Sequence, residues 1–324
     1  MDTNSFQVLV SNLTNPTLLF FVLGIVAALL KSDLEIPATS IRFISLYLLF
    51  SIGFKGGQEL EHSEATAEIW NSILFGTMIA MLIPVYSFYI LKNKVGISNA
   101  GAIAASYGSV SAVTFVSAVS FLEIQGQPFG GHMIAVMALM EFPAIIMGFV
   151  LINKYDKTRD RSVNLGSILK HAISNGSVLM IVGSLIIGIV ADSKQAEGIK
   201  PFTTDIFKGF LAIFLLEMGM ITVRRFSSFK KHGLFVFFFA ILIPLFNGCM
   251  VAMLSHYISD VAGTRFIFAI LAASASYIAV PAVLRHALPE VNPALYMGMS
   301  LGITFPFNII LGIPLYTYFA QSIS

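Results

Sequence analysis

Long apolar segments recur from one end of this chain to the other, and they restrict its fold more than any other feature. A helix of about 20 apolar residues crosses the hydrocarbon core of a bilayer. Only 11% of the residues are charged, whereas about a quarter are charged in a soluble globule. The sequence therefore predicts an all-α polytopic membrane protein, and no soluble stretch is long enough to add an enzyme domain.

Ten segments have the length of a membrane span, and the first and sixth contain the shortest apolar stretches. If the N-terminus lies outside, the inner loops hold 14 of the Lys and Arg residues and the outer loops hold 5. Because Lys and Arg gather on the inner side of a membrane, we expect both termini on the outer side. The predicted spans are 16–30, 41–57, 69–92, 99–122, 130–153, 175–191, 203–223, 233–256, 264–286 and 292–320.

The two halves of the chain resemble each other. Gly24–Ala27 reads G-I-V-A, as does Gly188–Ala191, and such short words recur in the same order at offsets of 163 to 167 residues. Five spans in each half make the second half enter the membrane from the opposite side, as in the inverted repeats of secondary transporters. The predicted units are a first five-helix repeat (1–153), a basic cytoplasmic linker (154–174) and a second, inverted repeat (175–324).

One pair of repeated stretches lies in the middle of the fourth and ninth segments, at Ser106–Thr114 and Ser274–Ala282. Their Gly, Ser, Pro and β-branched residues oppose a continuous helix. One interpretation is a pair of broken helices that cross near the middle of the membrane, with N-termini that suit a small anion. The alternative is that Gly and Ser serve only close helix packing. Hydroxyls that could hold a sodium ion beside the anion are those of Ser109, Ser111, Thr114, Ser274 and Ser276.

Glu141 lies inside the fifth segment, where a carboxylate is costly unless it is paired, protonated or in contact with water. We expect it to coordinate an ion or to brace the broken helix, and the alternative is a buried structural hydrogen bond. Thr304 and Asn308 lie in the matching part of the tenth segment. They either offer neutral oxygens to the same site or serve packing alone.

Other polar residues are predicted to lie at segment ends. His132 is expected at the surface, Lys55 at the interface, and Glu217 in a solvated position near the inner end of the seventh segment. Asp205 and Lys208 have the spacing of a pair on a helix surface.

The sequence contains no metal-ligand spacing, phosphate-binding loop or nucleophile elbow, so we expect neither an enzyme nor a cofactor. A net charge of +2 carries no signature of nucleic-acid binding.

Four stretches resemble the sodium-dependent bicarbonate transporter family known from cyanobacteria: Tyr107–Phe115, Met140–Ala144, Ala272–Ala282 and Leu288–Gly298. The resemblance extends over essentially the whole chain. It implies two inverted five-helix repeats divided into a core and a gate domain, a homotrimer in the bacterial inner membrane, and an elevator-like motion. It also implies that bicarbonate and sodium bind where the broken helices cross, and that a PII-type regulator can bind the cytoplasmic face.

The resemblance also implies which residues form the site. The chain departs from the family pattern at two places, because Tyr277 stands where cyanobacterial members have a sodium-binding aspartate and Ala112-Val113 replaces a Gly-Ser pair. Glu141 stands where those members have an aspartate. The anion would lie against the backbone of Ser111, Ala112, Val113 and Thr114 and of Tyr277, Ile278, Ala279 and Val280. The sodium ligands would come from Ser109, Ser111, Ser274, Ser276 and Glu141.

These observations predict a secondary transporter, a sodium-coupled symporter of bicarbonate or a similar small anion that works by alternating access. One alternative is a proton- or sodium-coupled carrier of a different small organic anion, with Glu141 as the titrating group. A second alternative is a membrane sensor that binds an anion without transporting it.

Overall fold

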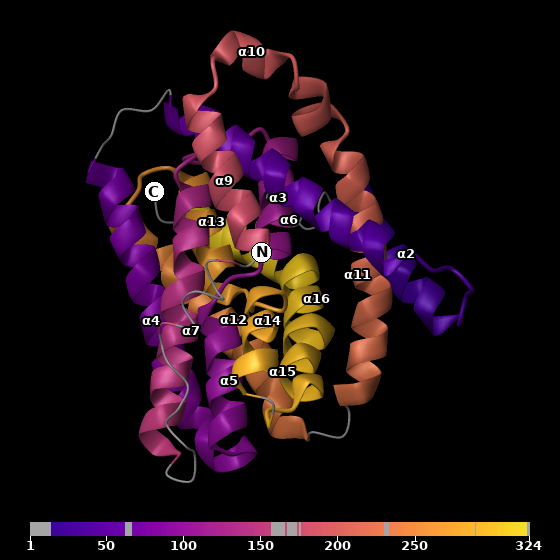
Figure 1. Ribbon diagram of the computed structural model, residues 1–324, viewed down its shortest axis with the longest axis vertical. Coiled ribbons are helices and arrows are strands. Elements are labelled where there is room, and N and C mark those ends of the chain that lie inside the picture. The colour runs from indigo at the N-terminus through magenta and orange to yellow at the C-terminus, as the bar shows by residue number, and fades with distance from the viewer. Residues whose placement is uncertain are drawn as a thin grey trace.

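The computed structural model describes residues 14–61, 67–156, 166, 174, 176–229, 233–288 and 290–322, and this part of the chain is helical with no strand (Figure 1). The all-α prediction is therefore confirmed. The long helices are α2 (Pro16–Leu29), α3 (Ala38–Glu61), α4 (Ala67–Val95), α5 (Ile97–Gly108), α6 (Ala112–Ile124), α7 (Met133–Tyr155), α9 (Gly176–Val190), α11 (Phe207–Phe229), α12 (Leu234–Leu254) and α13 (Ala262–Ala273). The shorter ones are α10 (Ser193–Glu197), α14 (Ala279–Ala287), α15 (Pro293–Met299), α16 (Phe305–Phe307) and α17 (Ile313–Ser322).

Seven helical segments of the described chain are long and apolar enough to cross a membrane, when α5 with α6 and α15 to α17 are each taken as one segment. The shorter apolar helices are α2, α9 and α13. The first and sixth predicted spans correspond to α2 and α9, which have 14 and 15 residues. The ninth is short for another reason, because α13 ends where the chain opens at Ser274.

Four helices associate as two closely packed pairs, α2 with α11 and α3 with α9. A Cβ atom at Gly24 would lie 1.9 Å from the carbonyl oxygen of Leu216, and one at Gly188 would lie 2.3 Å from that of Phe54. Only glycine lets two helix backbones come this close. The two G-I-V-A words therefore have the same role, since each supplies the glycine at which one pair of helices meets.

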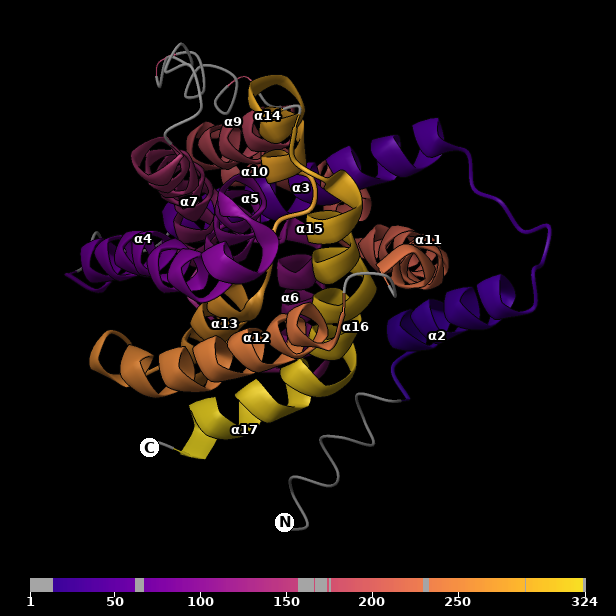
Figure 2. The same ribbon diagram turned by 90° about the horizontal axis from the view of Figure 1, so that it is seen from below.

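The remaining long helices pack on one another. Helices α4, α5 and α7 form one cluster, and α12, α13 and α17 form another. Figure 2 shows α12, α13 and α17 side by side on one flank of the molecule, with α2 and α11 on the opposite flank. The last segment has π-helical turns at Ser300–Thr304 and Asn308–Gly312, which interrupt its α-helical pattern.

Some predictions fall on residues outside the described part of the chain. These are residues 1–13 at the N-terminus and most of the basic linker at 154–174. The division into repeats at 1–153 and 175–324 stays a prediction.

Candidate functional site

Two helices are interrupted within the stretches that the sequence singles out. Helix α5 ends at Gly108 and α6 begins at Ala112, while α13 ends at Ala273 and α14 begins at Ala279. The first residue after α5, Ser109, has φ −82° and ψ 175°, and the first residue after α13, Ser274, has φ −83° and ψ 168°. Both serines are thus in the extended conformation, and the helical hydrogen-bond pattern stops there.

The two interruptions are joined by hydrogen bonds, although they are 163 residues apart in the sequence. The backbone N–H of Ser111 donates to Oγ of Ser274 at 2.9 Å, and the backbone N–H of Ser276 donates to the carbonyl oxygen of Ser106 at 2.7 Å. Each break therefore supplies an acceptor for a backbone donor that the other break has freed, as a low-polarity environment requires.

The start of α6 is capped by its own side chains. Oγ of Ser111 accepts from the backbone N–H of Thr114 at 3.2 Å and from its hydroxyl at 2.9 Å. In the second break, the backbone N–H of Val280 lies 3.4 Å from Oγ of Ser276. These serines have the role expected of N-cap residues, which satisfy the free donors of the first helical turn.

The carbonyl groups at the end of α13 are satisfied by amide side chains. Asn308 Nδ2 donates to the carbonyl oxygen of Ala273 at 2.7 Å, and Asn247 Nδ2 donates to that of Ala272 at 3.2 Å. The hydroxyl of Thr304 donates to the carbonyl oxygen of Ala240 at 2.7 Å. Asn308 thus stabilises the backbone at the second break, whereas Thr304 bonds the backbone of α12, and neither residue lines the pocket described next.

A pocket lies where the two breaks face helices α3 and α9. It offers about 20 Å³ to the centre of a water-sized molecule, which is room for one water or one small ion. Among the described residues of its lining, Glu141 is the one carboxylate and there is no basic side chain. The lining residues are Leu49, Val110, Ser111, Ala112, Glu141, Ser177, Ser276, Tyr277 and Ile278.

Three hydroxyl groups in or beside the breaks are buried without a hydrogen-bond partner. They belong to Ser106, Ser109 and Tyr277. The Tyr277 side chain is 7% exposed, and its hydroxyl lies near Ser111 without forming a hydrogen bond. Buried hydroxyls are nearly always paired, and these three have no partner among the described residues. Of the three residues, Tyr277 lines the pocket.

The structure brings part of the predicted site together at the pocket. Ser111, Ala112, Tyr277 and Ile278 line it, as do the predicted ion ligands Ser276 and Glu141. The other predicted residues are buried and do not line it; these are Val113, Thr114, Ala279, Val280, Ser109 and Ser274. Ser274 and Thr114 instead take part in the hydrogen bonds that hold the breaks.

Besides Val110, which lies inside the first predicted stretch, two lining residues were not predicted, Leu49 of α3 and Ser177 of α9. Neither belongs to a motif or to a repeated word. They reach the pocket because α3 and α9 pack against each other and face the breaks, which no local pattern reveals.

Three predictions about single residues were wrong. His132 is buried rather than at the surface, where its Nε2 lies 3.1 Å from the hydroxyl of Ser72 and burial lowers its pKa. Glu217 is buried, with 7% of its side chain exposed, rather than solvated. Asp205 ends a π-helical turn instead of sharing a helix surface with Lys208, and the structure gives the two no ion pair.

A comparison with protein-family models matches residues 16–321 to the Na+-dependent bicarbonate transporter superfamily. The chain belongs to this superfamily. The match includes both breaks, the pocket and all the helices from α2 to α17 except the last residue of α17. A search of curated proteins gave no match.

Membership of the superfamily implies a Na+-dependent bicarbonate transporter, not an enzyme. The long apolar helices agree with a multi-pass membrane protein. For a member of this superfamily, the pocket has the polarity that a site for two ions of opposite charge requires. It combines the N-terminal ends of α6 and α14 with the carboxylate of Glu141.

Proposed function

We propose that the protein is a symporter that couples sodium to the uptake of bicarbonate or a similar small anion, and that the pocket at the two breaks holds both ions. The observation that supports this most strongly is the pair of reciprocal hydrogen bonds between the breaks. They fix two helix starts and the hydroxyl groups of Ser111, Ser276 and Tyr277 around one small space in a chain of the bicarbonate transporter superfamily.

The anion is proposed to bind at the first turns of α6 and α14. Among the described residues, the lining has no Lys or Arg side chain, and the attraction for an anion is proposed to come from backbone N–H groups and the helix dipoles. Ala112 and Ile278 lie at these helix starts and bring no polar side chain. Discrimination between anions would therefore depend on backbone geometry and on the Tyr277 hydroxyl.

The sodium ion is proposed to bind the oxygens of Glu141, Ser111 and Ser276 with carbonyl groups of the opened turns. Sodium, like other hard cations, prefers oxygen ligands. The Ser276 hydroxyl accepts one hydrogen bond at the helix start, and its oxygen has a second lone pair for a cation. The Ser111 oxygen accepts two, so a cation would replace the hydrogen bond from the Thr114 hydroxyl. The predicted ligands Ser109 and Ser274 belong to the same proposal, at the ends of the opened turns.

Alternating access is proposed as the mechanism because the pocket lies between the α3/α9 pair and the breaks and is too small for a bicarbonate ion in this conformation. Leu49 and Ser177 close it from the side of α3 and α9. Its space is that of one water-sized molecule, and a bicarbonate ion is larger. A relative movement between the α3/α9 pair and the breaks would widen the pocket and change the side from which it is reached.

A second candidate function is the transport of a small organic anion coupled to protons. It is favoured by one observation, which is that Glu141 is the one carboxylate of the lining while Tyr277 replaces the aspartate of the cyanobacterial members. In this case Glu141 would bind and release the proton.

Uptake of labelled bicarbonate into proteoliposomes, with and without an inward sodium gradient, tests the proposal. We expect sodium-stimulated uptake that is lost in the double variant Ser111→Leu with Ser276→Leu. Glu141→Gln should weaken the dependence on sodium. Uptake that ignores sodium but responds steeply to pH, and loses this response in Glu141→Gln, would support the second candidate. If the protein is correctly inserted but takes up no bicarbonate, with or without the sodium gradient, the proposal of a sodium–bicarbonate symporter is wrong.

The remaining architecture is proposed on the resemblance stated above. It comprises ten spans in two inverted repeats with core and gate domains, a homotrimer in the inner membrane with outward termini, and a PII-type regulator on the cytoplasmic face.

A further inference from the structure

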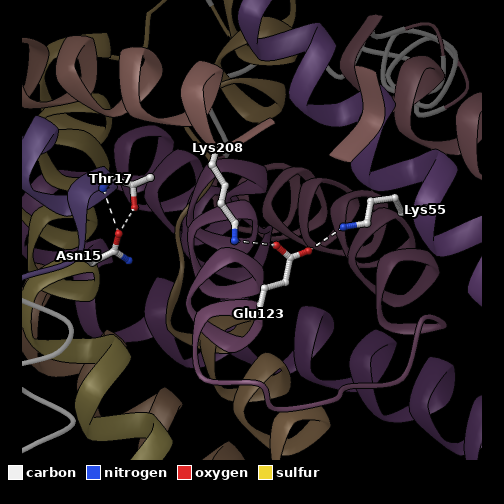
Figure 3. Close-up of polar contacts among 5 residues, drawn as sticks. All are labelled: Asn15, Thr17, Lys55, Glu123 and Lys208. Carbon is white, nitrogen blue, oxygen red and sulfur yellow. Dashed lines mark hydrogen bonds and ion pairs between the residues drawn. The ribbon is translucent and has the colours of Figure 1, made fainter. Parts of the chain in front are cut away.

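A cluster of charged side chains joins the far end of α6 to two other helices (Figure 3). Glu123, in the last turn of α6, lies 2.6 Å from Nζ of Lys55 in α3 through its Oε1. Its Oε2 lies 3.9 Å from Nζ of Lys208 in α11. One carboxylate is thus shared by two ammonium groups that come from different helices.

Two of the three helices that meet at this cluster, α3 and α6, also line the pocket. Helix α6 begins at the first break, and Ala112 lies about 17 Å from Glu123 along its axis. Helix α3 contributes Leu49 to the pocket, and Lys55 lies about 9 Å further along it. The ion pair and the pocket therefore lie in one interface, between α6 and α3, at different depths.

Residues around the ion pair also bring α3 into contact with α6 and the loop that follows it. Glu59 of α3 interacts electrostatically with Lys55 and with Glu123. A Cβ atom at Gly131, which follows α6 in the chain, would lie 2.6 Å from Cβ of Glu59. The loop after α6 is therefore in close contact with α3 next to the ion pair.

The ion pair between Lys55 and Glu123 is weak enough to break and re-form. The Lys55 and Glu123 side chains are 31% and 29% exposed, and partly exposed ion pairs contribute little to overall stability. Such a pair can shift the balance between two arrangements of similar free energy without preventing the exchange between them.

We propose that Glu123, held by Lys55 and Lys208, is a latch that keeps the end of α6 against α3 and α11 in the conformation described, and that it opens during each transport cycle. The inference rests on the proposed transport function. It goes beyond that function by assigning a role to three residues that lie outside the ion-binding pocket.

Cross-linking tests whether the latch has to open. In a Cys249→Ser background, Lys55→Cys with Glu123→Cys is treated with a bifunctional thiosulfonate reagent and assayed in proteoliposomes. We expect uptake to fall at least tenfold and to return on reduction. The control joins Gln58→Cys in α3 to Ala191→Cys, which follows α9, because the Gln58 amide already donates to the Ala191 carbonyl oxygen at 3.0 Å. Cross-linking there should leave uptake unchanged. Equal uptake before and after cross-linking of the latch pair would overturn the proposal.

A second measurement does not depend on the transported substrate, so it separates failure of the latch from failure of the proposed function. Ser177→Cys, at the pocket, is labelled with a maleimide in the Cys249→Ser background. We expect Glu123→Gln to speed the labelling at least threefold, because it releases the conformation in which Leu49 and Ser177 close the pocket. The charge exchange Lys55→Glu with Glu123→Lys should restore the rate. Identical rates in all three proteins would overturn the latch even if bicarbonate is transported.

Discussion

Tyr277 combines two properties that do not usually occur in one buried residue. Its ring packs edge-on against Phe305 with centroids 5.9 Å apart, and its hydroxyl is buried at the pocket without a partner. The ring therefore has a structural role and the hydroxyl is available for a ligand, and substitutions can separate the two.

Tyr277→Phe keeps the ring contact and removes the hydroxyl. We expect a loss of about tenfold in anion uptake at limiting substrate, since a lost hydrogen bond to a charged ligand costs about 1.5–3 kcal/mol. The melting temperature should stay within about 2 °C of the parent. Unchanged uptake kinetics would show that the hydroxyl does not touch the substrate.

Tyr277→Asp introduces the acid of the cyanobacterial members. It should lower the sodium concentration needed for half-maximal uptake, because a carboxylate in the opened turn adds a charged ligand for the cation. The measurement is the sodium dependence of initial uptake rates. A sodium dependence equal to that of the parent would place the ion away from the second break.

Ser274 links the two breaks, and its loss should be costly although only one oxygen is removed. In Ser274→Ala the buried N–H of Ser111 loses its acceptor, which costs about 1–3 kcal/mol. The matched control is Ser300→Ala, because Ser300 is equally buried and its hydroxyl bonds only carbonyl groups of its own helical segment. Thermal unfolding should show a clear loss for the first variant and little change for the second. Equal losses of thermal stability in the two variants would mean that the hydrogen bond between the breaks adds nothing to stability beyond that of an ordinary buried serine.

At the scale of helices, glycine has two different uses in this chain. In the pairs α2/α11 and α3/α9 it allows backbones to touch. In the first break, Gly108 lies against Pro84 of α4, where a Cβ atom would come within 2.2 Å of the proline ring. The packing interpretation therefore applies to Gly108 at the break as well, and the chain leaves the helical conformation at the serines that follow the helices, Ser109 and Ser274.

Helix α9 offers a direct test of the first use. A Cβ atom at Gly188 would lie 2.3 Å from the carbonyl oxygen of Phe54, whereas one at Gly183 in the same helix would meet nothing within 4 Å. Gly188→Ala should destabilise the protein by about 1–3 kcal/mol through overpacking. Gly183→Ala should leave stability unchanged or raise it by up to about 1 kcal/mol. The measurement is the melting temperature of each variant in the same detergent. If Gly188→Ala is as stable as Gly183→Ala, the close contact between α9 and α3 is wrong.

For the whole molecule, cysteine labelling can test the predicted orientation, in which both termini lie on the outer side of the membrane. Lys194 lies on the exposed helix α10 and Lys94 at the end of α4, and both side chains are exposed. If both termini lie outside, a membrane-impermeant maleimide should label Lys194→Cys in intact cells. Lys94→Cys should be labelled only after lysis, with both substitutions made in the Cys249→Ser background. The reverse pattern would invert the orientation that the positive-inside rule gives.

The sequence by itself determined the helical membrane character, the positions of the two breaks and the family. These features follow from local properties, because apolar length specifies a span and Gly, Ser and Pro oppose a helix wherever they cluster. It also pointed to six of the pocket residues. Five lie in or beside the breaks, and the sixth, Glu141, is a carboxylate inside an apolar segment; the five are Ser111, Ala112, Ser276, Tyr277 and Ile278.

Only the tertiary structure decided which groups face one another. It placed Leu49 and Ser177 opposite the breaks, assigned Asn308 to a free carbonyl group, buried His132, and brought Glu123 between Lys55 and Lys208. Each of these contacts joins segments far apart in the chain. In this protein a buried polar group finds its partner on whichever helix packs against it, and the packing is set by the shape of all the helices together.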